Sequence, residues 1–233
     1  MGLDPEENPI ITSQPRILRV ASLNVSGITK ECLGDMCTYL INHSEADVIA
    51  LQGVNQLWYE PVFRAFKSNG YNYTKPDPLL ERKDMELLFS KIPIVKRVYK
   101  RFVQTTQSRG VMFYQVKVGP GEPRLIWVCT SQLESGGPGN GPRKHQIAEI
   151  PKMALKDEDA IFLGDTNIPA WQSVESPIGW LDAWREKGSV DTEKTSLEDR
   201  KDRIYYTQGV RCTFFDLVCK SENRRGVIAS FIV

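Results

Sequence analysis

The residues that could do chemistry in this sequence stand at the ends of apolar segments. Residues 161–167 read IFLGDTN, so an apolar run delivers the carboxylate of Asp165 and the amide of Asn167 to its end. Residues 17–23 form another short apolar run, which ends at Asn24. Oxygen-bearing side chains are the ligands that a hard divalent cation such as Mg²⁺ prefers. Asn24, Asp165 and Asn167 are therefore the first candidate site residues.

Histidine, a common general base at such sites, is nearly missing from the chain. It occurs twice, as His43 and His145, and no histidine follows residue 145. His43 lies at the end of a predicted helix and His145 lies inside another, and we interpret both as surface or capping residues. A site that needs a histidine from the C-terminal part of the chain cannot be assembled from this sequence.

Composition indicates one ordinary globular domain. The chain has 233 residues, of which 41% are hydrophobic and 25% are charged, as in a single large domain with a substantial core. We expect a polar lead-in over residues 1–15 and one domain over residues 16–233. The formal net charge of +1 neither requires nor excludes a nucleic-acid partner.

Cysteine usage and the N-terminal segment bear on the compartment. The five cysteines are odd in number and lack metal-ligand spacing, so we expect reduced thiols. Residues 1–15 carry acids and prolines rather than a basic start and an apolar run, and no membrane span is visible. We therefore expect an intracellular location, nuclear or cytoplasmic, and no membrane partner.

Hydrophobic periodicity predicts two halves of alternating strands and helices, with antiparallel hairpins between them. The predicted strands are residues 17–23, 47–52, 85–90, 93–103, 110–118, 124–131, 160–164, 202–207, 211–218 and 226–233. The predicted helices are residues 30–43, 56–68, 143–155 and 178–187. This order indicates an α/β sandwich in which two packed sheets are covered by helices on the outside.

Five segments, in this order, resemble the endonuclease/exonuclease/phosphatase superfamily and, within it, the tyrosyl-DNA phosphodiesterase 2 group. They are SLNVSG at 22–27, DVIALQ at 47–52, TSQLES at 130–135, GDTN at 164–167 and KDRIYY at 201–206. The resemblance covers residues 16–233. It implies a four-layered α/β sandwich and Mg²⁺-dependent cleavage of phosphodiesters, in that group the link between a tyrosine and a DNA end.

The resemblance implies roles for four residues that match its motifs. Asn24 matches an asparagine at the first strand end, and Asp202 matches the aspartate before Arg-Ile. Asp165 and Asn167 match the pair that positions the nucleophilic water and the phosphate. Simpler interpretations stay open for each: a turn-forming asparagine, an Asx turn after a strand, and an ion pair of Asp202 with a basic neighbour.

Other positions lack the side chains that this chemistry needs. Gly53 stands where the family has a metal-binding glutamate, and Gln132 stands where it has a histidine. Asn223 and Arg224 stand where its C-terminal motif has an aspartate and a histidine. Loss of one member of a catalytic unit commonly costs about 10³–10⁶ in rate, and this chain lacks several.

We therefore expect a pseudoenzyme, which is a phosphodiesterase fold kept as a binding or scaffolding module without metal or cofactor. A protein partner or a phosphate-bearing ligand fits this hypothesis. Arg224 and Arg225 are candidate phosphate contacts, because they make the cleft less acidic. Gln132 is a third, because its amide can hydrogen-bond a phosphate. The resemblance also implies a DNA repair-related setting, and the oligomeric state stays open.

Two alternatives remain. A weak or altered Mg²⁺-dependent phosphodiesterase acting on DNA or RNA ends could combine Asp165 with Glu134, Asp182 or Glu222 as carboxylates. Non-catalytic binding of nucleic acid would use the basic and aromatic run KRVYKR at residues 96–101. The simpler interpretation of that run is a solvated strand face, or an edge strand protected by lysines.

Overall fold

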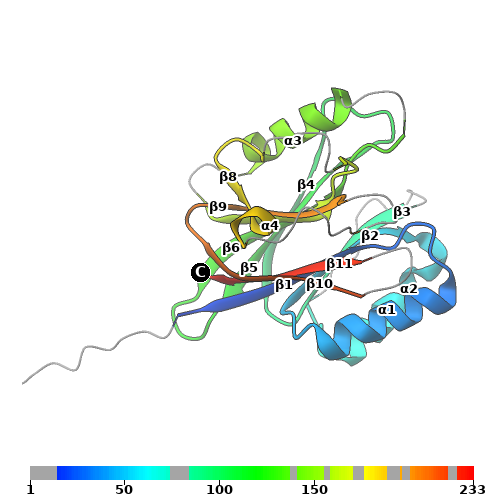
Figure 1. Cartoon of the computed structure of the whole chain (residues 1–233). Helices are drawn as coiled ribbons and strands as arrows, with labels where there is room; N and C mark the ends of the chain where they lie inside the picture. The colour runs from blue at the N-terminus through cyan, green and yellow to red at the C-terminus, as the bar shows by residue number, and fades with distance from the viewer. Residues whose placement is uncertain are drawn as a thin grey trace, which may run out of the picture.

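In the computed structural model, two β-sheets pack face to face and helices cover their outer faces (Figure 1). The structure describes residues 15–73, 84–136, 141–154, 158–169, 176–187, 195, 200–219 and 225–233. The prediction of a loose lead-in over residues 1–15 lies almost wholly outside these ranges.

The first sheet has the strand order β10-β11-β1-β2-β3. Its strands are β1 (Ile17–Asn24), β2 (Val48–Asn55), β3 (Asp84–Ser90), β10 (Arg211–Val218) and β11 (Gly226–Ile232). β1 and β2 are parallel and are connected through α1 (Lys30–His43), whereas the other neighbours pair antiparallel. Thr29 begins α1 as its N-cap, since its side chain accepts a hydrogen bond from the N–H of Cys32.

The second sheet has the strand order β4-β5-β6-β7-β9-β8. Its strands are β4 (Ile94–Arg101), β5 (Gly110–Val118), β6 (Arg124–Gln132), β7 (Ala160–Asp165), β8 (Trp180–Asp182) and β9 (Asp202–Thr207). β6 and β7 are parallel and are connected through α3 (Gly141–Met153). The remaining neighbours pair antiparallel, so both sheets are mixed.

Three hydrophobic clusters fill the spaces between four layers. Val20 and Ile161 belong to the cluster between the two sheets. Phe66 of α2 (Tyr59–Ser68) packs with residues of α1 and of the first sheet, and Ile147 and Ile150 of α3 pack on the second sheet. Because successive strand residues point to opposite faces, each sheet contributes to two clusters. The predicted four-layered α/β sandwich is therefore confirmed.

Two predicted helices differ from the observed elements. Residues 178–187 were predicted as one helix, but Trp180–Asp182 pairs with β9 as strand β8. The helix α4 (Ala183–Glu186) begins only after Asp182, whose side chain caps it by accepting a hydrogen bond from the N–H of Trp184 at 3.0 Å. The predicted helix over residues 56–68 starts as a 3₁₀ turn (Gln56–Trp58), which continues into α2.

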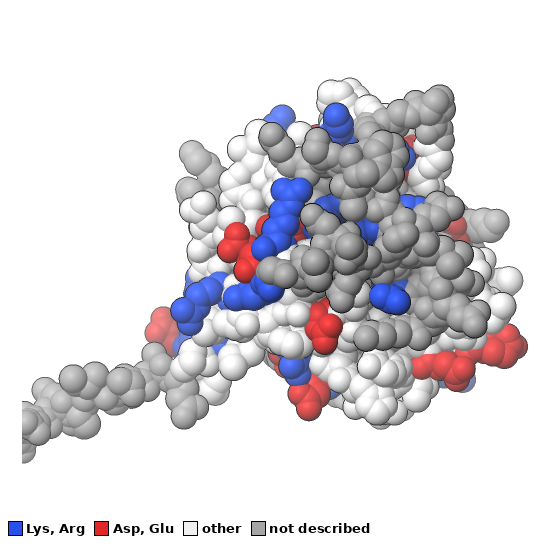
Figure 2. Space-filling view, viewed as in Figure 1, with Lys and Arg blue, Asp and Glu red and all other residues white. Residues whose placement is uncertain are grey.

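Cysteines and charges agree with an ordinary globular chain. All five cysteines are free, as predicted. On the face in Figure 2, a short row of basic side chains lies over the region of α4 and β9, with acidic side chains beside it. Among the described residues, no helix is both long and apolar enough to span a membrane. The compartment itself stays a prediction.

Candidate functional site

Polar residues from both sheets meet at one edge of the sandwich. Asn24 ends β1, Gln132 ends β6 and Asp165 ends β7. Strand pairing places Gln52 beside Asn24, and it places both Gln132 and Asp202 beside Asp165. The structure therefore brings together residues that lie far apart in the sequence.

A side-chain hydrogen bond connects the two sheets at this edge. Nδ2 of Asn24 donates to Oδ2 of Asp165, and both side chains are buried. Oδ1 of Asn24 accepts a hydrogen bond from the N–H of Ser26 at 2.7 Å. Both ends of the Asn24 amide group are therefore engaged within the chain.

The segment after β7 forms an Asx turn. Oδ1 of Asp165 accepts a hydrogen bond from the N–H of Asn167 at 2.7 Å. Asn167 has a φ of 50°, in the left-handed region that asparagine tolerates. Its Nδ2 donates to the carbonyl of Leu133 at 2.8 Å. Each oxygen of the Asp165 carboxylate thus accepts one hydrogen bond from the chain, and the Asn167 amide supports the neighbouring strand.

The side chain of Gln52 connects the two sheets next to the site. It is completely buried, and its Nε2 donates to Oγ1 of Thr130 at 2.9 Å and to Oγ of Ser22 at 3.0 Å. Since buried polar groups need hydrogen-bond partners, this pairing sets the position of the end of β2 against β6.

Gly53 follows directly, at a position that only glycine fits. The pairing of β2 with β3 shifts register between Leu51 and Val54, and Gly53 has a φ of 69°. A Cβ at Gly53 would lie 1.8 Å from Oγ and 2.9 Å from Cβ of Ser26. The backbone conformation and the Ser26 side chain therefore both disfavour a larger residue.

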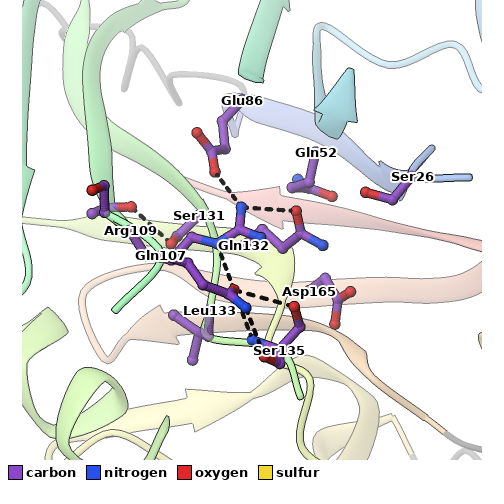
Figure 3. Close-up of polar contacts among 12 residues, drawn as sticks. Ser26, Gln52, Glu86, Gln107, Arg109, Ser131, Gln132, Leu133, Ser135 and Asp165 are labelled. Atoms are coloured by element: carbon purple, nitrogen blue, oxygen red, sulfur yellow. Dashed lines mark hydrogen bonds and ion pairs between the residues drawn. The ribbon is translucent and has the colours of Figure 1, made fainter. Parts of the chain in front are cut away.

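Arg109 is the site residue that the sequence interpretation missed. Its Nη1 donates to Oε1 of Gln132 at 3.0 Å and lies 3.6 Å from Oε1 of Glu86. Its Nε donates to Oε1 of Gln107 at 3.3 Å. Figure 3 shows the guanidinium of Arg109 between Glu86 and Gln132. The side chains of Arg109 and Glu86 are 12% and 3% exposed, so this ion pair is largely shielded from solvent.

A weak signal for this pair was present in β3. Glu86 interrupts an apolar run, MELLF over residues 85–89. By strand alternation it shares a face with Leu88, which packs in the core between the sheets. A buried acid there requires a cation or hydrogen-bond donors. The sequence did not show which of the 30 lysines and arginines would supply the charge.

Comparison with known proteins bears on the fold. No protein-family model matches the chain, and no curated protein matches it. Among solved structures, a humanized D. rerio TDP2 with 14 mutations aligns with a TM-score of 0.75 at 20% identity, covering 92% of this chain and 98% of that one. An endonuclease/exonuclease/phosphatase family protein from Bacteroides thetaiotaomicron aligns with a TM-score of 0.76 at 15% identity, covering 94% and 98%.

The chain has the endonuclease/exonuclease/phosphatase fold. A third match, the human Nocturnin catalytic domain with a bound sulfate anion, aligns with a TM-score of 0.73 at 15% identity, covering 92% of this chain and 94% of that one. The resemblance to the superfamily and to the TDP2 group is thus confirmed at the level of the fold. Identities this low carry no information about the reaction.

The described residues at this edge do not fit the Mg²⁺ ion that the resemblance implies. In the described ranges, no three His, Cys, Asp or Glu side chains form a group that could hold a metal. Asp165 accepts hydrogen bonds from Asn24 and Asn167, and Gly53 offers no ligand. Glu86 is already ion-paired with Arg109, whose positive charge would repel a dication.

The remaining candidate positions are placed as follows. Asp202 is buried, and its N–H donates to Oγ1 of Thr195 at 3.0 Å. The N–H of Arg225 donates to the carbonyl of Thr195 at 2.9 Å, and its side chain is half-buried. Asn223 and Arg224, together with Glu222, lie outside the described residues.

Asp182, one of the carboxylates named for a rearranged site, is engaged elsewhere. Asp182 accepts a hydrogen bond from Arg200 and lies 3.7 Å from Nη1 of Arg203, so it balances two buried arginines. The ion pair of Arg203, on β9, is with Asp182, on the neighbouring strand β8. These contacts support the fold, and they leave no spare carboxylate at Asp182 for a rearranged site.

Glu134 organises the loop that carries Arg109. Its buried carboxylate accepts hydrogen bonds from Oγ1 of Thr105 at 2.9 Å and from the N–H groups of Thr106 and Gln107 at 2.7 Å each. Gln146 of α3 donates to it at 3.3 Å. Burial raises the pKa of Glu134, but the hydrogen bonds from Thr106, Thr105 and Gln146 outweigh burial and hold the pKa below its ordinary value.

Replacing Glu134 with glutamine should destabilise the chain by about 1–2 kcal/mol at neutral pH, because charge-assisted hydrogen bonds to the loop would be weakened. A carboxyl group whose pKa is lowered on folding stabilises above its ordinary pKa, and this stabilisation is lost as the pH falls through the folded-state pKa. The difference from the unmodified chain should therefore shrink towards about pH 3. Urea unfolding at neutral pH and at about pH 3 measures this difference in the free energy of unfolding.

Glu149→Gln is the matched control, because Glu149 supports the same loop through one hydrogen bond, from the N–H of Val103 at 3.0 Å. Its effect on the free energy of unfolding should be smaller, because one hydrogen bond to the loop is weakened rather than several. Equal effects of the two variants at both pH values would contradict the assigned role of Glu134.

Proposed function

We propose that this chain is a catalytically inactive phosphodiesterase fold that serves as a binding module and takes a phosphate-bearing ligand without a metal. The observation that carries the proposal is the Arg109 cluster at the carboxyl edge of the sheets. A shielded guanidinium lies there between Glu86 and Gln132. Hydrolysis of a phosphodiester by a metal would instead need free carboxylates and a dication.

The chemistry of Arg109 supports an anionic ligand. A guanidinium has five N–H donors in a planar fork that suits phosphate oxygens. Its second terminal nitrogen, Nη2, makes no hydrogen bond to any residue that the structure describes, and the side chain keeps 12% of its surface exposed. Gln132 beside it can donate through its amide group. The human Nocturnin catalytic domain, which has the same fold, holds a sulfate anion.

A protein partner and a DNA repair-related setting also fit a binding module, and both stay predictions. The weak phosphodiesterase remains the competing hypothesis, because Asn24, Asp165 and Asp202 lie together at the edge. Binding of nucleic acid through residues 96–101 also stays a prediction. It would weaken steeply as the salt concentration rises.

Hydrolysis assays separate the inactive module from the enzyme. We expect a 5′-tyrosyl oligonucleotide and bis(p-nitrophenyl) phosphate to be cleaved at the same background rate by the unmodified chain and by Asp165→Ala, with Mg²⁺ or Mn²⁺ present. Turnover that depends on the metal and disappears in Asp165→Ala would overturn the proposal.

Titration with inorganic phosphate in the presence of EDTA tests the ligand. The Nε–H resonance of Arg109 should shift and saturate without any metal. Arg64, an exposed arginine paired with Glu60 on α2, provides the reference and should not saturate. Equal behaviour of the two arginines would remove phosphate as the ligand of this edge.

A further inference from the structure

A hollow lies on the face of the second sheet that α3 covers. It is open to solvent and has a volume of about 200 Å³, and its described lining residues are Lys96, Val98, Lys100, Phe113, Trp127 and Met153. Val98, Phe113 and Trp127 pack in the cluster under α3. The residues of the Arg109 site, such as Gln132 and Asp165, lie instead at the strand ends between the sheets. The hollow is therefore separate from the Arg109 site.

The run KRVYKR forms strand β4, and its alternation explains the lining. Lys96, Val98 and Lys100 point to the α3 side, whereas Tyr99 packs against the core between the sheets. The side chains of this basic run are thus divided between the two faces of the sheet. The face with the two lysines also carries the apolar floor.

The two lysines stand over aromatic rings rather than beside carboxylates. Nζ of Lys96 lies 5.7 Å from the ring centroid of Trp127, and Nζ of Lys100 lies 5.6 Å from that of Phe113. Lys100 also donates to the carbonyl of Met153. In the part of the chain that the structure describes, neither ammonium group forms an ion pair with a carboxylate. Among the described residues, the lining therefore carries two positive charges and no negative charge.

One acid that contacts the floor of the hollow, Glu158, is held by other groups. Glu158 accepts a hydrogen bond from the indole N–H of Trp127, and Gln115 donates to it at 3.5 Å. Glu158 does not line the hollow. Its bond to Trp127 fixes the ring that forms the floor.

Size and charge together select a ligand class. A cavity of about 150 Å³ is large enough for a benzene ring, whereas pockets for drug-sized ligands usually exceed about 300 Å³. The floor of Phe113, Trp127, Val98 and Met153 favours an apolar body, and the lysines favour an anion through charge-assisted hydrogen bonds. We propose that this hollow binds a small aromatic carboxylate, one ring with one acid group, whose ring enters the hollow and whose carboxylate meets Lys96.

The probe for this proposal is 4-fluorophenylacetate, observed by ¹⁹F NMR with the full chain. Saturable binding is expected, and the neutral 4-fluorophenylacetamide should bind at least about tenfold more weakly, a difference of about 1.4 kcal/mol. Lys96→Met should weaken binding of the acid by a similar factor and leave binding of the amide unchanged. Methionine retains an apolar stem over Trp127 while it removes the charge.

Lys117→Met is the matched control. Lys117 is exposed on β5, on the same face by alternation as Phe113, and it does not line the hollow. This variant should bind the acid as the unmodified chain does. Equal binding of the acid and the amide, no effect of Lys96→Met, or no saturable binding would overturn the proposal. Each result is independent of the Arg109 site.

Discussion

Replacing Arg109 with methionine is expected to lower the free energy of unfolding by about 3 kcal/mol. The buried carboxylate of Glu86 would lose the cation that lies 3.6 Å away, and Gln132 would lose its donor at 3.0 Å. Methionine fills much of the same volume, so the loss would report charge and hydrogen bonding rather than a cavity. Urea unfolding at neutral pH measures the change.

A double variant shows whether the loss comes from the ion pair. Arg109→Met with Glu86→Leu should recover most of the stability, because the buried carboxylate that Arg109 balances is removed together with it. The exposed pair of Arg64 with Glu60 is the reference, and Arg64→Met should cost less than about 0.5 kcal/mol. If Arg109→Met costs no more than Arg64→Met, the Arg109 cluster does not stabilise the fold.

This result would also bear on the balance of charge at the edge of the two sheets. Carboxylates at the edge of two packed sheets repel one another unless a cation lies among them. Here Arg109 provides a positive charge that is part of the chain itself. The Asn24–Asp165 hydrogen bond and the Gln52–Thr130 hydrogen bond connect the sheets beside it. Stability should accordingly be unchanged by EDTA.

Restoring a glutamate at Gly53 is expected to destabilise the chain by at least about 2 kcal/mol and to create no Mg²⁺ site. A φ of 69° costs any residue with a Cβ about 1–2 kcal/mol. The Cβ would also lie 1.8 Å from Oγ of Ser26, so the loop after β1 must move. Asp165 and Asn24 would still be bonded to each other. Thermal unfolding and calorimetric titration with Mg²⁺ test the two parts.

Three further variants separate the cost of the backbone conformation from the cost of the collision with Ser26. Gly121 has a φ of 70° in open space, so Gly121→Ala measures the cost of the backbone conformation alone. Gly53→Ala should cost clearly more, and Ser26→Gly should remove the excess. Mg²⁺ binding by Gly53→Glu without loss of stability would contradict this view of the position, and it would bring the enzyme hypothesis forward.

The fold was predictable from the sequence because its determinants are local. Alternating apolar residues define strands such as residues 110–118 and 124–131, and helical spacing defines residues 30–43, whatever lies elsewhere in the chain. The errors arose where a long-range contact overrode local preference. Residues 180–182 became a strand because β9 offered an open edge to pair with.

The site was predictable only in part. Strand-end residues such as Asn24 and Asp165 could be named, because the carboxyl ends of strands are visible in the sequence. That Asn167 would hold Leu133, and that Asp165 would accept from Asn24, depends on contacts over 34 and 141 residues. A motif identifies the side chains, whereas their hydrogen bonds decide whether they are available to a ligand.

The sequence by itself determined the four-layered fold, the lack of a histidine after residue 145 and the lack of a carboxylate at Gly53. Only the tertiary structure decided that Ser26 fills the space beside Gly53 and that Arg109 pairs with Glu86. The physical reason is that side-chain identity and periodicity are properties of the chain, whereas charge pairing depends on which strands become neighbours. The sequence shows that Gly53 supplies no metal ligand at this edge, and the structure shows that Arg109 places a positive charge there.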